Sequence, residues 1–159
     1  MNLHRLAQDR AEAGHPVRVG LIGAGKFGSM FLAQAPHSPL VVTAIADLDV
    51  DRARRSCAEV GWSEAAVAAT AFTDSADDLL ARGDVDVVVE ATGNPVVGVD
   101  HALACFAAGK HLVAVNVEAD ALVGPQLAAA AEAGVVYSLA YGDQPARWGP
   151  RCRPGWPGG

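Results

Sequence analysis

Two patterns of apolar positions alternate along this chain. Short runs of β-branched and other apolar residues predict buried strands at residues 17–22, 40–46, 70–72, 85–90, 112–115 and 135–139. Between these runs, apolar residues recur at spacings of three and four, which predicts helices. The expected helices are residues 2–13, a segment from the turn after residue 22 to near residue 36, and residues 49–60, 75–82, 95–108 and 120–133.

A regular alternation of strands and helices joined by short loops is typical of an α/β layer fold. Because the runs are apolar throughout, the strands should be buried on both faces of a single parallel sheet. We therefore predict a doubly wound sheet of about six strands in the order 3-2-1-4-5-6, with right-handed crossovers. We expect residues 1–146 to form this domain, with residues 1–16 as an N-terminal helix and lead-in.

The composition and net charge of the chain exclude some classes of binding partner. The chain is 51% hydrophobic but only 6% aromatic, which suits helices packed closely on a sheet. A formal net charge of −6 argues against nucleic acid and against an anionic membrane surface as partners. The charged N-terminal segment contains no apolar stretch of signal-peptide length, and no later run reaches the length of a membrane span, so we expect a cytoplasmic protein. Three cysteines without CxxC spacing predict reduced thiols, and we predict no metal site.

The last thirteen residues, 147–159, break the pattern. The segment RWGPRCRPGWPGG contains three prolines, four glycines and three arginines, a composition that supports neither helix nor strand. We expect this segment to be disordered. It is compatible with an ordinary flexible terminus and with an abnormal end, such as a reading-frame shift in GC-rich DNA. We favour the abnormal end.

The first predicted strand runs into a glycine-rich turn that opens the next helix. Gly23, Gly25 and Gly28 stand in the order G-x-G-x-x-G. The first glycine permits a tight turn, the second lets a pyrophosphate approach the backbone, and the third allows close packing of helix on strand. The helix N-terminus offers free N–H groups to the anion, and we include Lys26 and Phe27 among the cofactor-binding residues. The turn predicts a Rossmann domain that binds NAD(H) or NADP(H), and its alternative role is packing alone.

Lys26 does not turn this segment into the phosphate-binding P-loop of nucleotide hydrolases. That motif requires the spacing GxxxxGK(S/T), which is absent here. The glycine-rich turn therefore points to a dinucleotide and not to a nucleoside triphosphate.

Asp47 ends the second predicted strand, nineteen residues beyond Gly28. A carboxylate at this position can accept hydrogen bonds from the hydroxyls of the adenosine ribose, which favours NAD over NADP. Arg52, Arg54 and Arg55 follow closely, and one of them could neutralise a 2′-phosphate if Asp47 turned aside. A solvated helix face is the alternative for these arginines. The cofactor is therefore predicted as NAD(P), with NAD preferred.

A second group of polar residues follows the fourth predicted strand, in the segment EATGNP at residues 90–95. The carboxyl end of this strand should lie beside the glycine-rich turn, where the strand order reverses, so its loop should line the nicotinamide half. Thr92, Gly93 and Asn94 are the expected contacts. Asn94 has an alternative role as the cap of the helix that Pro95 begins.

The segment NVEAD at residues 116–120 follows the fifth predicted strand and should face the same crevice. Glu118 or Asp120 could carry a proton or bind a metal, and these two are the candidate catalytic residues. Capping the next helix is the alternative that the sequence favours for them. His101 and His111, each alone on its element, are expected to be structural.

Taken together, four segments resemble the N-terminal domain of homoserine-dehydrogenase-like oxidoreductases. They are GLIGAGKFGSMF, VVVEATGNP, GKHLVAVNVEAD and VVYSLAYGDQP. The resemblance covers about residues 5–146 and is strongest to a reductoisomerase-like branch. That branch is similar in activity to 1-deoxy-D-xylulose-5-phosphate reductoisomerase, uses NADPH and often carries a C-terminal SAF domain. The resemblance implies an oxidoreductase that acts on a small carbonyl or hydroxyl substrate.

Two departures limit what this resemblance implies. Homoserine dehydrogenases carry a lysine after the asparagine of the fifth strand, whereas Val117 follows Asn116 here, which argues against homoserine as the substrate. Beyond residue 146 the chain changes to the unusual tail, where these relatives continue into a catalytic and dimerisation domain. We therefore expect a truncated protein without that domain or full activity. Apolar edge positions such as Leu139 and Tyr141 should then promote self-association.

These observations predict the dinucleotide-binding domain of an NAD(P)-dependent oxidoreductase. Its expected partners are the dinucleotide and a small-molecule substrate. The exposed edge of the sheet is compatible with a homo-oligomer. A module that holds the dinucleotide without turning over a substrate is the first alternative. The second is an S-adenosylmethionine-dependent methyltransferase, which also has a glycine-rich first turn and an acidic second strand. Six regular strands with the full G-x-G-x-x-G spacing disfavour the methyltransferase.

Overall fold

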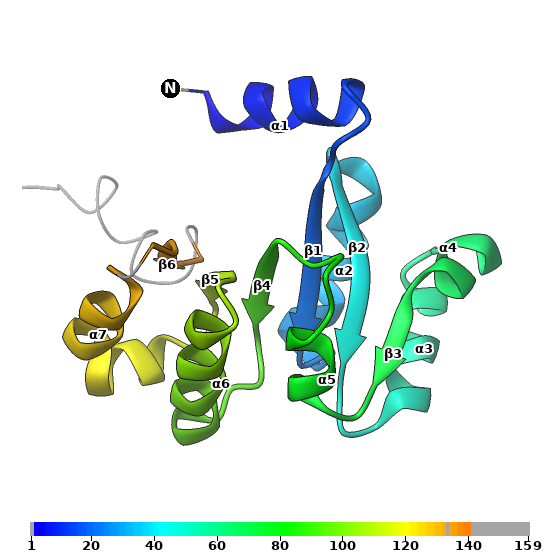
Figure 1. Cartoon of the computed structure of the whole chain (residues 1–159). Coiled ribbons are helices and arrows are strands. Elements are labelled where there is room, and N and C mark those ends of the chain that lie inside the picture. The colour runs from blue at the N-terminus through cyan, green and yellow to red at the C-terminus, as the bar shows by residue number, and fades with distance from the viewer. Residues whose placement is uncertain (1, 133, 141–159) are drawn as a thin grey trace, which may run out of the picture.

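A single parallel sheet runs through the centre of the molecule. The computed structural model describes residues 2–132 and 134–140, so the predictions for Tyr141 and for residues 147–159 lie outside the described residues. Six strands form the sheet in the order β3-β2-β1-β4-β5-β6 (Figure 1). They are β1 Val17–Ile22, β2 Leu40–Ala46, β3 Ala71–Thr73, β4 Val87–Glu90, β5 His111–Ala114 and β6 Tyr137–Leu139. The predicted α/β Rossmann fold and its strand order are confirmed.

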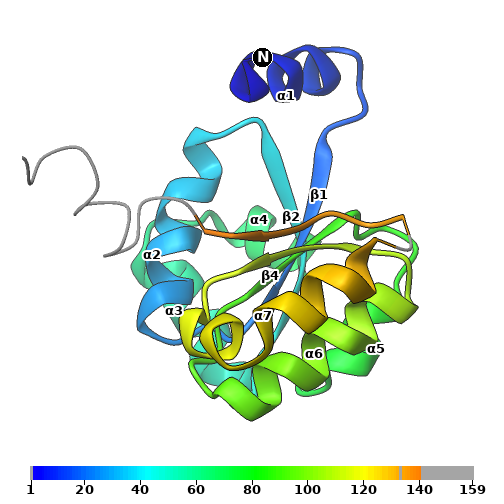
Figure 2. The same ribbon diagram turned by 90° about the vertical axis from the view of Figure 1, so that its left-hand side faces the viewer.

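Helices cover both faces of this sheet (Figures 1 and 2). Helices α2 (Lys26–Gln34) and α3 (Val50–Glu59) pack on one face. The opposite face is covered by α5 (Ala76–Leu80), α6 (Pro95–Ala107) and α7 (Val117–Ala131). Helix α1 (Leu3–Glu12) lies beyond the start of β1, away from the carboxyl ends of the strands (Figure 1). Two short helices complete the described chain, namely η1 Ala35–His37 and α4 Glu64–Ala69.

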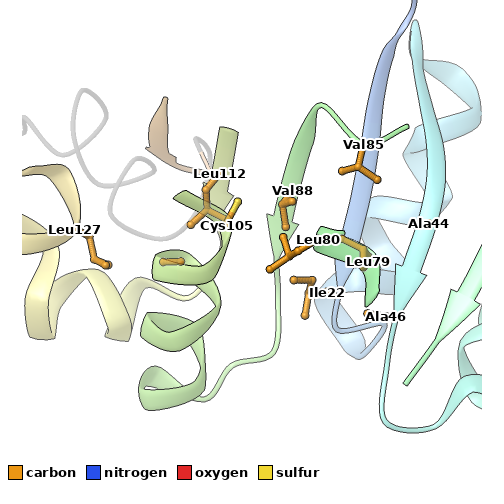
Figure 3. Packing of buried hydrophobic residues seen from close by; sticks show 11 residues of the cluster. Ile22, Ala44, Ala46, Leu79, Leu80, Val85, Val88, Cys105, Leu112 and Leu127 are labelled. Atoms are coloured by element: carbon orange, nitrogen blue, oxygen red, sulfur yellow. The ribbon is translucent and has the colours of Figure 1, made fainter. Parts of the chain in front are cut away.

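The strands contribute to two apolar cores, because successive side chains point to opposite faces of a sheet. In β4, Val88 belongs to the core beneath α5, α6 and α7, whereas Val89 belongs to the core beneath α2 and α3. Figure 3 shows the first of these cores, in which Leu79 and Leu112 are buried. The next residue of β4, Glu90, follows the same alternation and places a carboxylate on the α6 side.

Two cysteines lie in opposite cores. Cys57 packs with α3 on one face and Cys105 with α6 on the other, and both are free thiols. Burial raises the pKa of Cys57 to about 11 and that of Cys105 to about 12. Both thiols are therefore protonated at neutral pH and fill space as small apolar groups.

The strands β3, β4, β5 and β6 differ from their predicted bounds by one or two residues at one or both ends. Three larger details also differ from the sequence prediction. Helix α4 occupies a segment for which no element was predicted, and Ser63 caps it by accepting a hydrogen bond from the amide of Ala66 at 3.2 Å. Helix α7 begins at residue 117 instead of 120, because Asn116 caps it. The helical backbone of α7 is interrupted at Val123, just before Pro125, whose ring cannot be placed in a regular helix interior. Each difference follows from a polar cap or a proline, which apolar spacing does not register.

Candidate functional site

A cleft of about 510 Å³ lies at the carboxyl ends of β1, β2 and β4, where the strand order reverses. The glycine-rich turn after β1, the acidic end of β2 and the loop after β4 all contribute to it. The lining residues are Ile22, Gly23, Gly25, Ala46, Asp47, Leu48, Arg52, Asp74, Ala76, Ala91, Thr92, Asn94, Val97 and His101. The topology thus brings together three segments that the sequence analysis singled out separately.

The three glycines of the turn differ in what surrounds them. Gly23 has a φ of +93°, and a Cβ there would lie 2.8 Å from backbone atoms of Ala91, so only glycine fits. A Cβ on Gly28 would lie 2.2 Å from the carbonyl oxygen of Gly23, because α2 packs directly on the turn. Gly25 has an ordinary φ of −69°, and no atom lies within 4 Å of the Cβ it could carry. Gly23 and Gly28 therefore build the turn, and Gly25 keeps the cleft open.

Helix α2 starts at this open position. Gly25 is its N-cap and supplies no side-chain hydrogen bond, so the first amides of the helix keep their donor capacity. Free N–H groups at the positive end of a helix dipole suit a phosphate group. Lys26 and Phe27 are exposed in the first turn, and neither side chain lines the cleft. Any contact that these two residues make with a phosphate is therefore expected from their backbone amides.

Asp47 is only 8% exposed, and its carboxylate accepts hydrogen bonds from three donors. Its Oδ2 accepts a hydrogen bond of 2.7 Å from the amide of Ala24 in the glycine-rich turn. Its Oδ1 accepts from the amide of Asp49 at 2.9 Å and from the Arg52 guanidinium at 2.7 Å. Burial opposes ionisation of this carboxyl, but the hydrogen bonds outweigh it and lower the pKa of Asp47 below its ordinary value. Asp47 is thus a fixed anion, and Oδ2 retains a lone pair for one more donor.

The three arginines of α3 have different surroundings. Arg52 lines the cleft and forms the ion pair with Asp47, although 53% of its side chain is exposed. Arg54 lies over the ring of Phe72, 4.3 Å from the ring centroid. Arg55 is exposed. The predicted alternative of a solvated helix face therefore describes Arg55 but not Arg52.

The loop between β4 and α6 forms the opposite wall. Thr92 and Asn94 line the cleft, and Gly93 between them has a φ of +73°. The Oδ1 of Asn94 accepts hydrogen bonds from the amides of Val96 and Val97 at 3.1 and 3.2 Å, so Asn94 caps α6. The cap uses only Oδ1 of this side chain. Asn94 can therefore cap the helix and still present its amide nitrogen to the cleft.

A glutamate and a histidine that the sequence analysis did not assign to the site lie beside this loop. Glu90, the last residue of β4, is 1% exposed, and its Oε1 accepts hydrogen bonds from the amide and the hydroxyl of Thr92. His101, which we expected to be structural, lines the cleft with its Nδ1 3.6 Å from that oxygen. Helical spacing was the available signal, because His101 follows Asn94 by seven residues, or two turns, on the same face of α6.

The candidate catalytic residues do not line the cleft. Glu118 is exposed in the first turn of α7. Asp120 accepts a hydrogen bond of 2.8 Å from the hydroxyl of Tyr137, and burial together with this bond raises the pKa of Tyr137. Neither acidic residue caps α7, because Asn116 does so. A catalytic role for Glu118 or Asp120 stays a prediction, and the geometry of the cleft adds nothing to it.

The described part of the chain contains no cluster of three or more His, Cys, Asp or Glu side chains arranged to hold a metal ion. None of the helices in residues 2–132 and 134–140 is both long and apolar enough to cross a membrane. The cytoplasmic location stays a prediction.

The sequence matches the family model of the homoserine dehydrogenase NAD-binding domain over residues 19–139. A homoserine dehydrogenase of Neisseria gonorrhoeae is 30% identical over 111 residues, which cover 64% of this chain and 23% of that protein. The structure is similar to a homoserine dehydrogenase of Thiobacillus denitrificans, with a TM-score of 0.64 and 26% identity, covering 78% of this chain and 29% of that one. It is also similar to GenD2 from gentamicin A biosynthesis in complex with NAD, with a TM-score of 0.62 and 26% identity, covering 78% of this chain and 34% of that one.

The chain spans 23% to 34% of the length of these relatives. The range that matches the family model contains the glycine-rich turn, Asp47 and the loop between β4 and α6. The cleft therefore lies within the part of the molecule that is shared with these oxidoreductases. This chain belongs to the family of homoserine dehydrogenase NAD-binding domains.

Proposed function

We propose that the cleft binds NAD(H) and that this chain is the dinucleotide-binding part of an oxidoreductase. The observation that carries the proposal is the hydrogen bond of 2.7 Å between the amide of Ala24 and the carboxylate of Asp47. This bond holds an anion at the end of β2 directly beside the open position at Gly25. A pyrophosphate and an adenosine ribose require these two features side by side.

Different residues of the cleft would contact different parts of the cofactor. The space at Gly25 and the free amides at the start of α2 fit the pyrophosphate. Asp47 would accept hydrogen bonds from the ribose hydroxyls, and the loop at Thr92 and Asn94 would line the nicotinamide half. The bound cofactor supplies hydride transfer at its nicotinamide ring, while the protein holds the ring in place and excludes water.

The arrangement around Asp47 favours NAD(H) over NADP(H). A 2′-phosphate on the adenosine ribose would meet the Asp47 carboxylate, which cannot turn aside without breaking its bond to Ala24. Arg52 could neutralise such a phosphate only by leaving Asp47. Because the Arg52 side chain of this ion pair is 53% exposed, its release from Asp47 costs little, and the preference against a 2′-phosphate comes mainly from the charge of Asp47. We therefore infer a preference for NAD(H), with NADP(H) as the weaker ligand.

For the substrate we propose a small molecule with a carbonyl or hydroxyl group, other than homoserine. The position after Asn116 carries Val117, whose side chain offers no charge or hydrogen-bonding group to a substrate. We also propose a homo-oligomeric assembly. The reductoisomerase-like branch uses NADPH, so the preference for NAD(H) inferred above would set this chain apart from that branch in its cofactor.

A module that binds the dinucleotide without turnover is the second candidate. It is favoured by the placement of Glu118 and Asp120 outside the lining of the cleft. Turnover of candidate carbonyl substrates in the presence of NADH would separate the two candidates. Oxidation of NADH above the rate of a binding-deficient variant would exclude the module.

The proposal is tested by isothermal titration calorimetry of this chain with NAD⁺, NADH, NADP⁺ and S-adenosylmethionine. We expect one site per chain, with NAD(H) bound more tightly than NADP(H) and no heat from S-adenosylmethionine. A chain that is folded by circular dichroism but binds neither nicotinamide dinucleotide would contradict the proposed function. Binding of S-adenosylmethionine in their place would support the methyltransferase alternative.

A further inference from the structure

The carboxylate of Glu90 is buried without a full set of partners. Only 1% of the residue is exposed, and its Oε2 has no hydrogen-bond partner within residues 2–132 and 134–140. Removing a carboxylate from water is costly unless its oxygens are hydrogen-bonded, and an apolar residue would suit a strand end packed beneath α6 better. The stability of the sheet therefore does not explain this glutamate.

The other oxygen of Glu90 contacts two residues of the cleft wall. Oε1 accepts hydrogen bonds from the amide of Thr92, at 3.1 Å, and from the hydroxyl of the same residue. It also lies 3.6 Å from Nδ1 of His101. Thr92 and His101 both line the cleft, so this one buried oxygen positions the loop after β4 and approaches the ring from α6.

A glycine one turn before His101 makes room for this arrangement. A Cβ on Gly98 would lie 3.3 Å from Oε2 of Glu90 and 2.7 Å from Nδ2 of Asn116. Asn116 cannot easily move away, because its Nδ2 donates a hydrogen bond of 2.7 Å to the carbonyl of Asn94 and its Oδ1 caps α7. The polar cluster of Glu90, Asn116 and His101 therefore packs directly against α6 at the one turn where Gly98 carries no side chain.

The imidazole of His101 has one buried edge and one accessible edge. Its Nδ1 is completely buried, faces Glu90 and has no hydrogen-bond partner in the described chain. The side chain as a whole is still 20% exposed and lines the cleft. The exposed part of the ring is therefore the distal edge, which carries Nε2. A neutral imidazole that keeps its proton on Nδ1 presents Nε2 as a hydrogen-bond acceptor.

We propose that His101 is a cofactor-binding residue and that Glu90 positions it. Glu90 holds the proton of the ring on Nδ1, and Nε2 accepts a hydrogen bond from an N–H or O–H group of the bound dinucleotide. The distance of 3.6 Å between Nδ1 and Oε1 shortens to a hydrogen bond when the ligand orders the cleft. This inference rests on the proposed function, because it assigns two further residues to the same dinucleotide site.

Three variants test the proposal by calorimetry with NADH. His101→Leu removes the acceptor at similar volume and should weaken binding roughly three- to tenfold, the range for one lost hydrogen bond. His101→Gln places an amide oxygen near the position of Nε2 and should restore most of the affinity. Glu90→Gln removes the charge that favours a proton on Nδ1 and should weaken binding less than His101→Leu does. Thermal melts of each variant separate a loss of fold from a loss of contact.

Nuclear magnetic resonance of the unmodified chain and of the Glu90→Gln variant tests the position of the proton directly. Imidazole ¹⁵N resonances report which ring nitrogen carries the proton, so His101 should show Nδ1–H both before and after NADH is added. The Nε2 resonance of His101 should shift on titration. In the Glu90→Gln variant the Nδ1–H tautomer should lose population, a change that a purely structural glutamate would not produce.

Titration with halves of the cofactor locates the donor. A weaker affinity of His101→Leu for ADP-ribose would place the contact on the adenosine half, and a weaker affinity for reduced nicotinamide mononucleotide would place it on the other half. Either result supports the proposal. Unchanged affinity of His101→Leu for NADH, with no shift of Nε2 in the unmodified chain, would overturn it and leave the proposed function intact. Failure of the unmodified chain to bind NADH would instead contradict the proposed function itself.

Discussion

The two walls of the cleft are built in different ways. On the β1–β2 side, Gly23, Gly25 and Gly28 belong to one turn and the helix that it opens, and Asp47, directly after β2, accepts a hydrogen bond from that turn. On the other side, Glu90 lies on β4, and the polar groups around it come from separate elements, α6 and the start of α7. The glycine-rich turn of the first wall is a local structure, whereas the contact of Glu90 with His101 on the second wall exists only where separate elements meet.

This difference explains why the glycine-rich turn could be predicted from the sequence and the contact between Glu90 and His101 could not. The conformation of a turn depends on a few consecutive residues, so the spacing G-x-G-x-x-G carries its own structural meaning. The contact between Glu90 and His101 depends on how α6 packs against β4, which no local spacing encodes. Mutations on the β1–β2 wall should therefore change mainly cofactor binding, whereas a mutation beneath α6 should change mainly the free energy of unfolding.

The largest effect is expected on the local wall. Gly25→Val should abolish binding of NADH, because the side chain would fill the open space at the start of α2 while the ordinary φ of −69° accepts it. Calorimetry with NADH measures the loss, and a thermal melt should show that the variant is still folded, with at most the small loss of stability expected for a poorer N-cap. Gly83→Val is the matched control, since Gly83 is exposed, has open space around it and does not line the cleft. Undiminished NADH affinity in a folded Gly25→Val chain would show that the cleft is not the cofactor site.

A smaller effect on the same wall concerns the choice of cofactor. Asp47→Ala should weaken NAD(H) binding about tenfold or more, since it removes a charged acceptor of the ribose hydroxyls. NADP(H) should lose less affinity, because the same change frees Arg52 for the 2′-phosphate and removes a repulsive charge. Parallel calorimetric titrations with both cofactors give the ratio of the two affinities. An equal loss for both cofactors would indicate that Asp47 does not face the adenosine ribose.

On the wall that the tertiary structure assembles, the effect is expected in stability and not in cofactor affinity. Gly98→Ala should lower the free energy of unfolding by about 1–3 kcal/mol, the usual cost of overpacking, because the new Cβ would meet Asn116 and Glu90. Urea denaturation followed by circular dichroism measures the change. Alanine is the better helix former, so a site with spare room would instead show stabilisation of up to about 1 kcal/mol. That result would mean that the polar cluster beneath α6 is loosely packed.

Much of the fold was predictable because its signals are local and repeated. The uninterrupted apolar runs of β1 and β2 lie at the predicted residues, and buried faces on both sides explain why those runs do not alternate. Helix α4 escaped prediction because its six residues are too few to show a period, and its start depends on the single cap Ser63. The start of α7 was misjudged for a related reason, since Asn116 was read as a residue of the crevice and caps the helix instead.

The residues of the candidate site likewise fall into those that the sequence predicted and those that only the tertiary structure placed. The sequence by itself determined the glycine-rich turn and the positions of β1 and β2, because each depends on backbone conformation or on burial patterns confined to neighbouring residues. The strand order followed from the alternation of strands and helices, since few topologies are compatible with that pattern. Only the tertiary structure decided that His101 reaches the cleft and that Asp120 pairs with Tyr137 outside its lining. It also decided that Arg52 is committed to Asp47. The physical reason is that a side chain's partners are set by the packing of whole elements, and the sequence states only which elements exist.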